Sequence, residues 1–445
     1  MSQRRLTIGL CTTVVAIAFE VIAVATAMPV AARELDGLPY YAWSFSLFMV
    51  GMLVATVVAG PASDRRGPVL PMLAGLVTFA AGLVLAASAP HMAQLVAGRL
   101  VQGLGSGLIN TAMFVIIARA FAPRQRPRMF TFISTAWVMP SFVGPPVSAW
   151  LTHAFGWRWV FLAVLPLVVL GGLMVLPALL ALRRTAPERV PGPAASLWAA
   201  GVVAAATVAL QLAGQRLDLV AVALLAAGLA GLAVGLPRLM PPGFLRFSRG
   251  LPAVIVVRGL LPGAFFGAEA FIPLMLVEQR RIALLLAGAT LTVGAVGWTT
   301  GAWLQSRPWL PVRRDRLITY GCGAVALGVA IVALVAADPG VWTGVVGVGW
   351  LFAGLGMGLS MASTNLTVMA FSRPEEQGRN GASLNVSDAL GSALFVALTG
   401  TLFAAMQPAG SLEVAFGALL AAMTGVALLA ALVSLRIGAV RNELA

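Results

Sequence analysis

The chain has 445 residues, of which 60% are hydrophobic and only 10% are charged, and its formal net charge at pH 7 is +14. This apolar content exceeds that of a soluble domain, so most of the chain is expected to lie in lipid. The basic residues are scattered singly between apolar runs and do not gather on one soluble module, which argues against nucleic-acid binding.

Fourteen apolar runs are long enough, at about 20 residues each, to cross a hydrocarbon core as helices. The first run follows Arg4 and Arg5 and resembles a secretory signal, but it is long and is interrupted by Glu20, so we interpret it as a retained span. The runs cover residues 7–31, 41–62, 69–89, 92–118, 129–153 and 157–182, then 197–214 and 218–236, and finally 251–276, 283–305, 316–336, 341–371, 380–404 and 413–435.

The runs predict an all-α integral membrane protein in three parts. These are an N-terminal six-helix bundle (1–183), a linker with two extra transmembrane helices (184–250) and a C-terminal six-helix bundle (251–445). If the N-terminus is cytoplasmic, the inner loops receive about four times as many arginines as the outer loops, as expected for a membrane protein. We therefore expect fourteen transmembrane helices with both termini cytoplasmic, in a multi-pass protein of a bacterial cytoplasmic membrane.

The two six-helix parts share a weak internal repeat. Gly103–Leu108 recurs as Gly354–Leu359, and Gly60 with Asp64 has a counterpart in Gly301 with Gln305. Repeated bundles of this kind are a common plan of transporters. The alternative is a chance recurrence, because small residues are frequent wherever membrane helices pack closely.

Two charged residues in the first half are candidates for proton chemistry. Glu20 lies near the middle of the first run, where a charged side chain costs at least about 2.5 kcal/mol. A carboxyl group in such surroundings can exchange a proton near neutral pH, although Glu20 could also be a neutral acid that is hydrogen-bonded within the bundle. Arg99 precedes Gln102 and Gly103 in the fourth run and either influences a nearby carboxylate or forms a fixed structural ion pair.

The second half offers further candidates. Glu269 follows Phe265 and Phe266, whose rings either line a cavity for hydrophobic cations or face lipid. Asp388 lies about two turns into its run and either belongs to the site or is stabilised by the positive end of its helix. Arg258 is equally shallow, and we interpret it as reaching toward the cytoplasmic interface. Further candidates for lining the substrate site are Trp137, Trp350 and Asn385.

Metal and nucleotide sites are not supported by the sequence. Cys11 and Cys322 lie far apart in apolar runs, and neither His91 nor His153 has a second ligand at metal-binding spacing. There is no phosphate-binding loop, and the chain contains no lysine. We expect no cofactor and no nucleotide, with the proton gradient as the energy source.

Four stretches resemble the major facilitator superfamily, and within it the fourteen-helix drug:proton antiporters. The set Gly60, Asp64, Arg65 and Gly67 is similar to the cytoplasmic turn between helices two and three of that superfamily. The resemblance implies that Asp64 and Arg65 latch the two bundles in one facing state. Pro68-Val69 stands where the family usually has a basic pair.

The other three stretches lie in membrane runs. Arg99 to Gly105 is similar to the fourth-helix signature of the family, in which the arginine is implicated in proton coupling. Gly144-Pro145 resembles the antiporter signature, whose kink is associated with export. The first run, with Glu20 at the acidic position and Pro29 at its end, is similar to the first-helix signature of the drug-transporter group.

These observations and the resemblance together predict a proton-coupled antiporter, not an enzyme, that exports small hydrophobic or cationic compounds by alternating access. The expected partners are protons, the substrate and the lipid bilayer, and we expect a monomer. Glu20 binds the proton with Arg99 tuning it, and Glu269 and Asp388 contact substrate or a second proton. Alternatives are an exporter of an endogenous lipid or metabolite, an integral-membrane enzyme, and a sensor that binds without transporting.

Overall fold

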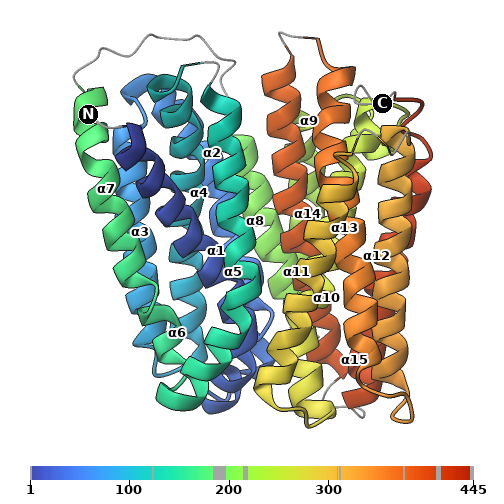
Figure 1. The fold of residues 1–445 in the computed structure, drawn as a ribbon. Coiled ribbons are helices and arrows are strands. Elements are labelled where there is room, and N and C mark those ends of the chain that lie inside the picture. Colours follow the sequence, from blue (N-terminus) through green and yellow to red (C-terminus); the bar gives the residue numbers. More distant parts are fainter. Residues whose placement is uncertain are drawn as a thin grey trace. The chain divides into compact units, whose positions relative to one another are not determined.

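The computed structural model describes residues 3–122, 125–183, 197–213, 219–307, 309, 312–373, 376–406 and 412–440 (Figure 1). Regular structure in these ranges is helical throughout. In lipid a helix satisfies every backbone hydrogen bond within its own segment, which explains why such apolar runs become helices. The chain divides into two compact units, Met1–Ala200 and Gly201–Ala445.

The first unit is built around two helices. α1 packs against α5 and α7, and α4 packs against α2 and α3. The elements are α1 (Gln3–Glu34), η1 (Leu38–Tyr40), α2 (Trp43–Arg66), α3 (Val69–Ala87), α4 (Met92–Ala120), α5 (Arg126–Phe155), α6 (Arg158–Leu162) and α7 (Leu165–Arg183).

The predicted run at 157–182 is interrupted in the structure. It divides into α6 and α7 at Ala163 and Val164. Pro166 follows the first residue of α7 and has no backbone N–H, so it cannot continue the hydrogen-bond ladder of α6.

In the second unit, α10 packs against α14 and α15, and α13 packs against α11 and α12. α8 begins just before the boundary between the units and lies against α9, where Gly228 and Gly231 face Ala206. The elements are α8 (Leu197–Ala213), α9 (Leu219–Leu239), η3 (Phe244–Arg246), α10 (Leu251–Leu274), η4 (Met275–Gln279, a π-helical turn), α11 (Leu284–Leu304), α12 (Arg314–Ala337), α13 (Val345–Phe371), α14 (Gln377–Met406) and α15 (Leu412–Ser434).

In both units the glycines of the repeat lie where neighbouring helices cross at close range. In α4, a side chain at Gly103 or Gly107 would collide with the backbone of α2, and one at Gly105 would collide with Phe79 of α3. In α13, the equivalent glycines Gly354, Gly358 and Gly356 meet the backbones of α11, α11 and α12 in the same order. Because these crossings leave no room for a Cβ atom, the repeat reflects a shared helix arrangement and not chance.

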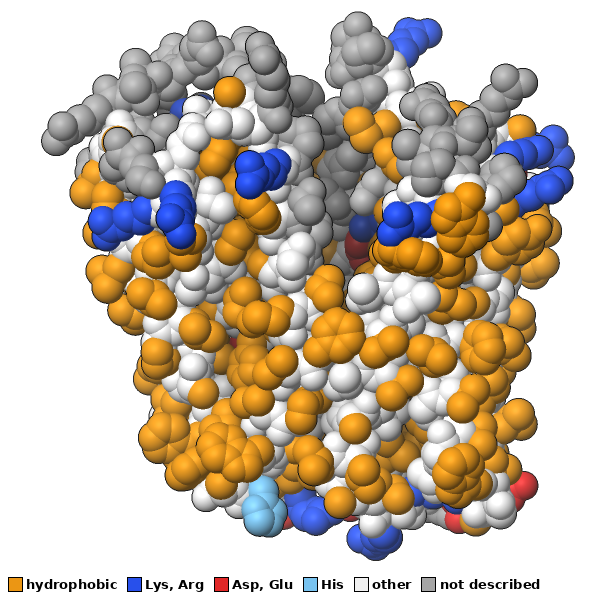
Figure 2. Space-filling view, viewed as in Figure 1, with side chains coloured by type: hydrophobic (Ala, Val, Ile, Leu, Met, Phe, Trp, Pro, Cys, Tyr) orange, Lys and Arg blue, Asp and Glu red, His pale blue; other side chains and the backbone are white. Residues whose placement is uncertain are grey.

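Twelve segments of the described chain are long and apolar enough to cross a membrane. They correspond to α1, α2 with η1, α3, α4, α6 with α7, α9, α10 with η4, and α11 to α15. Large apolar side chains are exposed along these helices, among them Val77, Leu173 and Leu334. Figure 2 shows hydrophobic side chains spread over the face of each unit that it presents. The protein is therefore a multi-pass membrane protein, whereas the count of fourteen spans and the orientation of the termini stay predictions.

Candidate functional site

Glu20 of α1 and Arg99 of α4 form an ion pair in the interior of the first unit. The two residues are 0% and 1% exposed. Arg99 Nη1 donates to Glu20 Oε1, and Arg99 Nε donates to the backbone oxygen of Ser44 at 2.8 Å. The ring of Phe48 lies 4.5 Å from the guanidinium carbon. A single arginine thus joins α1, α2 and α4.

The two oxygens of Glu20 have different environments. Oε1 is held by Arg99, whereas Oε2 is buried and accepts no hydrogen bond from any residue the structure describes. Gln102 is similar, since its Oε1 accepts from Arg99 Nη1 at 2.5 Å while its buried Nε2 lacks a described partner. A buried polar atom without a partner is costly, and a carboxylate oxygen in this condition is ready to receive a proton.

The Gly144-Pro145 stretch of α5 lies against α1 close to Glu20. A Cβ atom at Gly144 would lie 3.4 Å from Ile22, and Ser148 Oγ donates to the backbone oxygen of Ala23 at 2.5 Å. Gly144 and Pro145 are both buried. The structure therefore places two of the stretches that carry the family resemblance, those of Arg99 and of Gly144-Pro145, against a third, the part of α1 that contains Glu20.

The predicted cytoplasmic latch is only partly visible. The side chains of Asp64 and Arg65, and the surroundings of Gly60, lie outside what the structure describes, so their gating role stays a prediction. Gly67 ends α2 with a φ of +78°, a conformation that favours glycine. The backbone conformation of this turn is therefore sufficient to explain why position 67 is a glycine, independently of any latch.

In the second unit, four aromatic rings form a cluster beside Glu269. Phe265 stacks on Trp350 with 4.6 Å between ring centroids, and Trp298 meets Phe265 edge-on at 5.6 Å and Phe266 at 6.4 Å. Phe265 and Trp350 are buried, whereas Phe266 and Trp298 are half-buried. Trp298 could not be predicted from the sequence, because a lone tryptophan on α11 shows no spacing that links it to α10.

Glu269 follows Phe265 and Phe266 by one helical turn and therefore lies on the same side of α10. It is half-buried, and no described residue forms an ion pair or hydrogen bond with it. Glu269 differs in this respect from Glu20, which has an arginine of its own. An unpaired carboxylate next to ring faces is suited to attract a cation.

Arg258 corrects one of our predictions. It does not reach toward the interface but is buried, with 9% of its surface exposed, and its Nε donates to Asp388 Oδ2 at 3.0 Å. Its Nη1 donates to Met361 O and Thr364 Oγ1, both at 2.9 Å. Asp388 compensates the charge, so the guanidinium has no need of water.

Two remaining candidates are exposed. Trp137 of α5 is 37% exposed and Asn385 of α14 is also exposed. Their contact with substrate stays a prediction, as does the role of every other site residue.

Comparisons with known proteins agree on the family. The sequence model of the Major Facilitator Superfamily matches residues 8–396. A multidrug resistance protein B homolog of Mycobacterium tuberculosis is 33% identical over 125 residues, which are 28% of this chain and 23% of that protein. The multidrug transporter protein MdtP of Bacillus subtilis is 26% identical over 164 residues, or 37% of this chain and 30% of MdtP.

A longer match covers most of the chain. An MFS-type transporter of Mycobacterium tuberculosis is 26% identical over 400 residues, which are 85% of this chain and 56% of that protein. The chain thus aligns with about half or less of the length of these relatives.

Solved structures show the same fold at low identity. A POT family transporter in complex with 5-aminolevulinic acid superposes with a TM-score of 0.72 and 14% identity, over 97% of this chain and 96% of that chain. The human organic anion transporter MFSD10 gives a TM-score of 0.62 and 15% identity, over 98% and 100% of the two chains. The helical fold, the buried ion pair on α1 and α4 and the match over residues 8–396 lead to one conclusion: the chain belongs to the Major Facilitator Superfamily of transporters.

Proposed function

We propose that this protein is a proton-coupled antiporter that exports small hydrophobic or cationic compounds across the cytoplasmic membrane of a bacterium by alternating access. The observation that carries the proposal is the buried Glu20 carboxylate, with one oxygen on Arg99 and the other unpartnered. The multidrug transporters among the relatives support the substrate class.

The Glu20–Arg99 pair offers a physical route from proton binding to a change of conformation. With Glu20 ionised, the two buried charges compensate each other. When Glu20 is protonated, Arg99 stays charged and retains only neutral acceptors, the Ser44 backbone oxygen and Gln102 Oε1. Breaking a buried pair in this way costs about 3–5 kcal/mol, so protonation disfavours the observed arrangement of α1 and α4 relative to others.

The cluster beside Glu269 is the proposed contact for substrate. The half-buried rings of Phe266 and Trp298 offer apolar surface to neutral compounds and negative ring faces to cations. The Glu269 carboxylate adds a charge that no described arginine neutralises. These features favour lipophilic cations over anions of similar size.

The proposal is tested by transport of tetraphenylphosphonium, a lipophilic cation, in proteoliposomes with an imposed pH gradient. We expect movement against the proton flow that stops when an ionophore collapses the gradient, with protein-free liposomes as the control. Transport that is indifferent to the gradient would remove proton coupling from the proposal. Absence of transport for this cation, together with transport of a lipid or metabolite, would replace the substrate class.

A further inference from the structure

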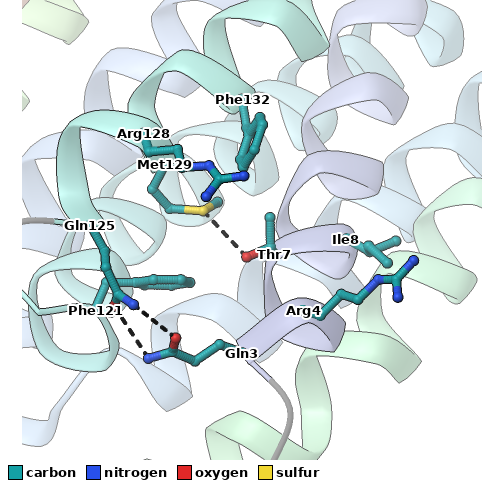
Figure 3. A pocket seen from close by; sticks show the side chains of 9 residues that line it. All are labelled: Gln3, Arg4, Thr7, Ile8, Phe121, Gln125, Arg128, Met129 and Phe132. Atoms are coloured by element: carbon teal, nitrogen blue, oxygen red, sulfur yellow. Dashed lines mark hydrogen bonds between the residues drawn. The ribbon is translucent and has the colours of Figure 1, made fainter.

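A pocket of about 430 Å³ lies where the start of α1, the end of α4 and the start of α5 meet in the first unit (Figure 3). It is separate from Glu20 and Arg99, and neither the sequence nor the proposed function assigns it a role. Both polar and apolar side chains line it, namely Gln3, Arg4, Thr7, Ile8, Phe121, Gln125, Arg128, Met129 and Phe132.

Side-chain contacts between the helices shape this pocket. Gln3 and Gln125 exchange two hydrogen bonds, at 3.3 and 3.1 Å, and Thr7 Oγ1 donates to Met129 Sδ at 3.5 Å. Figure 3 shows both contacts joining α1 to α5. The pocket therefore lies between α1 and α5, which these hydrogen bonds connect directly.

Two arginines carry the charge of the pocket, Arg4 from α1 and Arg128 from α5. Both are exposed, and no carboxylate among the described residues forms an ion pair with either of them. The guanidinium carbon of Arg128 lies 5.4 Å from the centroid of the Phe132 ring. In Figure 3 the side chains of Arg4 and Arg128 extend to opposite sides of Thr7, so their two charges attract an anionic headgroup at the pocket rather than hold a single phosphate between them.

The apolar part of the pocket faces outward as well. Ile8 is 43% and Phe132 is 39% exposed, so both leave apolar surface uncovered beside the arginines. On the orientation predicted from the arginine distribution, this end of α1 and α5 lies at the cytoplasmic surface of the bilayer. At that depth the neighbouring molecules are phospholipids, whose headgroups meet the arginines and whose acyl chains meet apolar side chains.

We propose that this pocket binds an anionic phospholipid of the cytoplasmic leaflet, with its negative headgroup attracted by Arg4 and Arg128 and its acyl chains beside the apolar side chains of Ile8 and Phe132. A lipid fits better than free phosphate because a soluble anion makes no use of the exposed apolar residues. The bound lipid bridges α1 and α5, the helices that carry Glu20 and Gly144-Pro145.

Native mass spectrometry of the full chain tests the proposal without any need for transport. Phosphatidylglycerol and phosphatidylcholine of matched chain length are titrated onto the parent and onto the double variant Arg4→Gln/Arg128→Gln. The control Arg249→Gln/Arg373→Gln removes two exposed charges from the second unit. Thermal unfolding of the parent and of every variant confirms that each protein is folded.

The parent and the control should prefer phosphatidylglycerol, and the double variant should lose about five-fold in its affinity for that lipid for each arginine removed. Phe132→Ala should weaken the binding of both lipids by the same factor. Equal binding of the two lipids by the parent, or an unchanged preference in the double variant, would overturn the proposal. Displacement of the lipid by soluble glycerol phosphate at equal concentration would overturn it too, because the site would then recognise a free anion.

Discussion

Arg258 of α10 and Asp388 of α14 form an ion pair across 130 positions of sequence, with 3.0 Å between Nε and Oδ2. Through Met361 O and Thr364 Oγ1 the same guanidinium also holds α13. Arg99 of α4 has the corresponding contacts in the first unit, where it donates hydrogen bonds to Glu20 of α1 and to the backbone oxygen of Ser44 in α2. In each unit a buried arginine therefore contacts two neighbouring helices and connects them to its own helix.

Breaking the Arg258–Asp388 pair on one side should destabilise the second unit. Arg258→Gln leaves Asp388 charged without its partner, and we expect a loss of about 3 kcal/mol in the free energy of unfolding. This value is at the low end for a buried pair, because 27% of the Asp388 side chain is exposed. Thermal unfolding in detergent measures the change.

The double variant Arg258→Gln/Asp388→Asn provides the matched control. It removes both charges, so it should recover part of the lost stability. A double variant that is less stable than Arg258→Gln by the full effect of Asp388→Asn would mean that the two residues do not interact.

The glycines of α13 should differ sharply in their tolerance of a methyl group. Gly354→Ala places Cβ against the backbone of Gly294, whereas Gly347→Ala in the same helix meets nothing within 4 Å. We expect Gly354→Ala to cost about 1–3 kcal/mol and Gly347→Ala to leave stability unchanged. Thermal unfolding of the two variants side by side tests this, and equal stabilities would contradict the close crossing of α11 and α13.

The ring of Phe266 should matter more for cations than for neutral compounds. Phe266→Leu keeps an apolar side chain but removes the ring face, so binding of tetraphenylphosphonium should weaken by about 0.5–2 kcal/mol. Binding of a neutral hydrophobic dye should change less. Phe416→Leu, in the buried contact between Phe403 and Phe416, is the control. If both variants lose cation binding equally, the cluster beside Glu269 has no special role.

Much of the fold follows from the sequence because the bilayer imposes the length and polarity of each span. Within the described residues, each predicted apolar run falls on a helix, although the run at 157–182 is divided in two. Glu20 and Arg99 could be singled out from sequence because a charge inside an apolar run is costly wherever its partner lies. Their direct contact is a result of the structure.

The pairings that depend on distant helices could not be predicted. Arg258 was misread because its partner lies on α14, and no local pattern connects the two residues. Trp298 joins Phe265 and Trp350 only through the packing of α10, α11 and α13. The pocket at Arg4 and Arg128 likewise depends on how the ends of α1, α4 and α5 meet.

The central claim is that Glu20 couples proton movement to transport, and proteoliposomes with a pH-sensitive dye inside test it most directly. Addition of tetraphenylphosphonium to the parent should drive a proton flux, and Glu20→Gln should abolish that flux because glutamine cannot exchange a proton. Asp36→Asn, which removes an exposed carboxylate outside the helices, should behave like the parent. A Glu20→Gln protein that keeps the full substrate-driven proton flux would contradict the account.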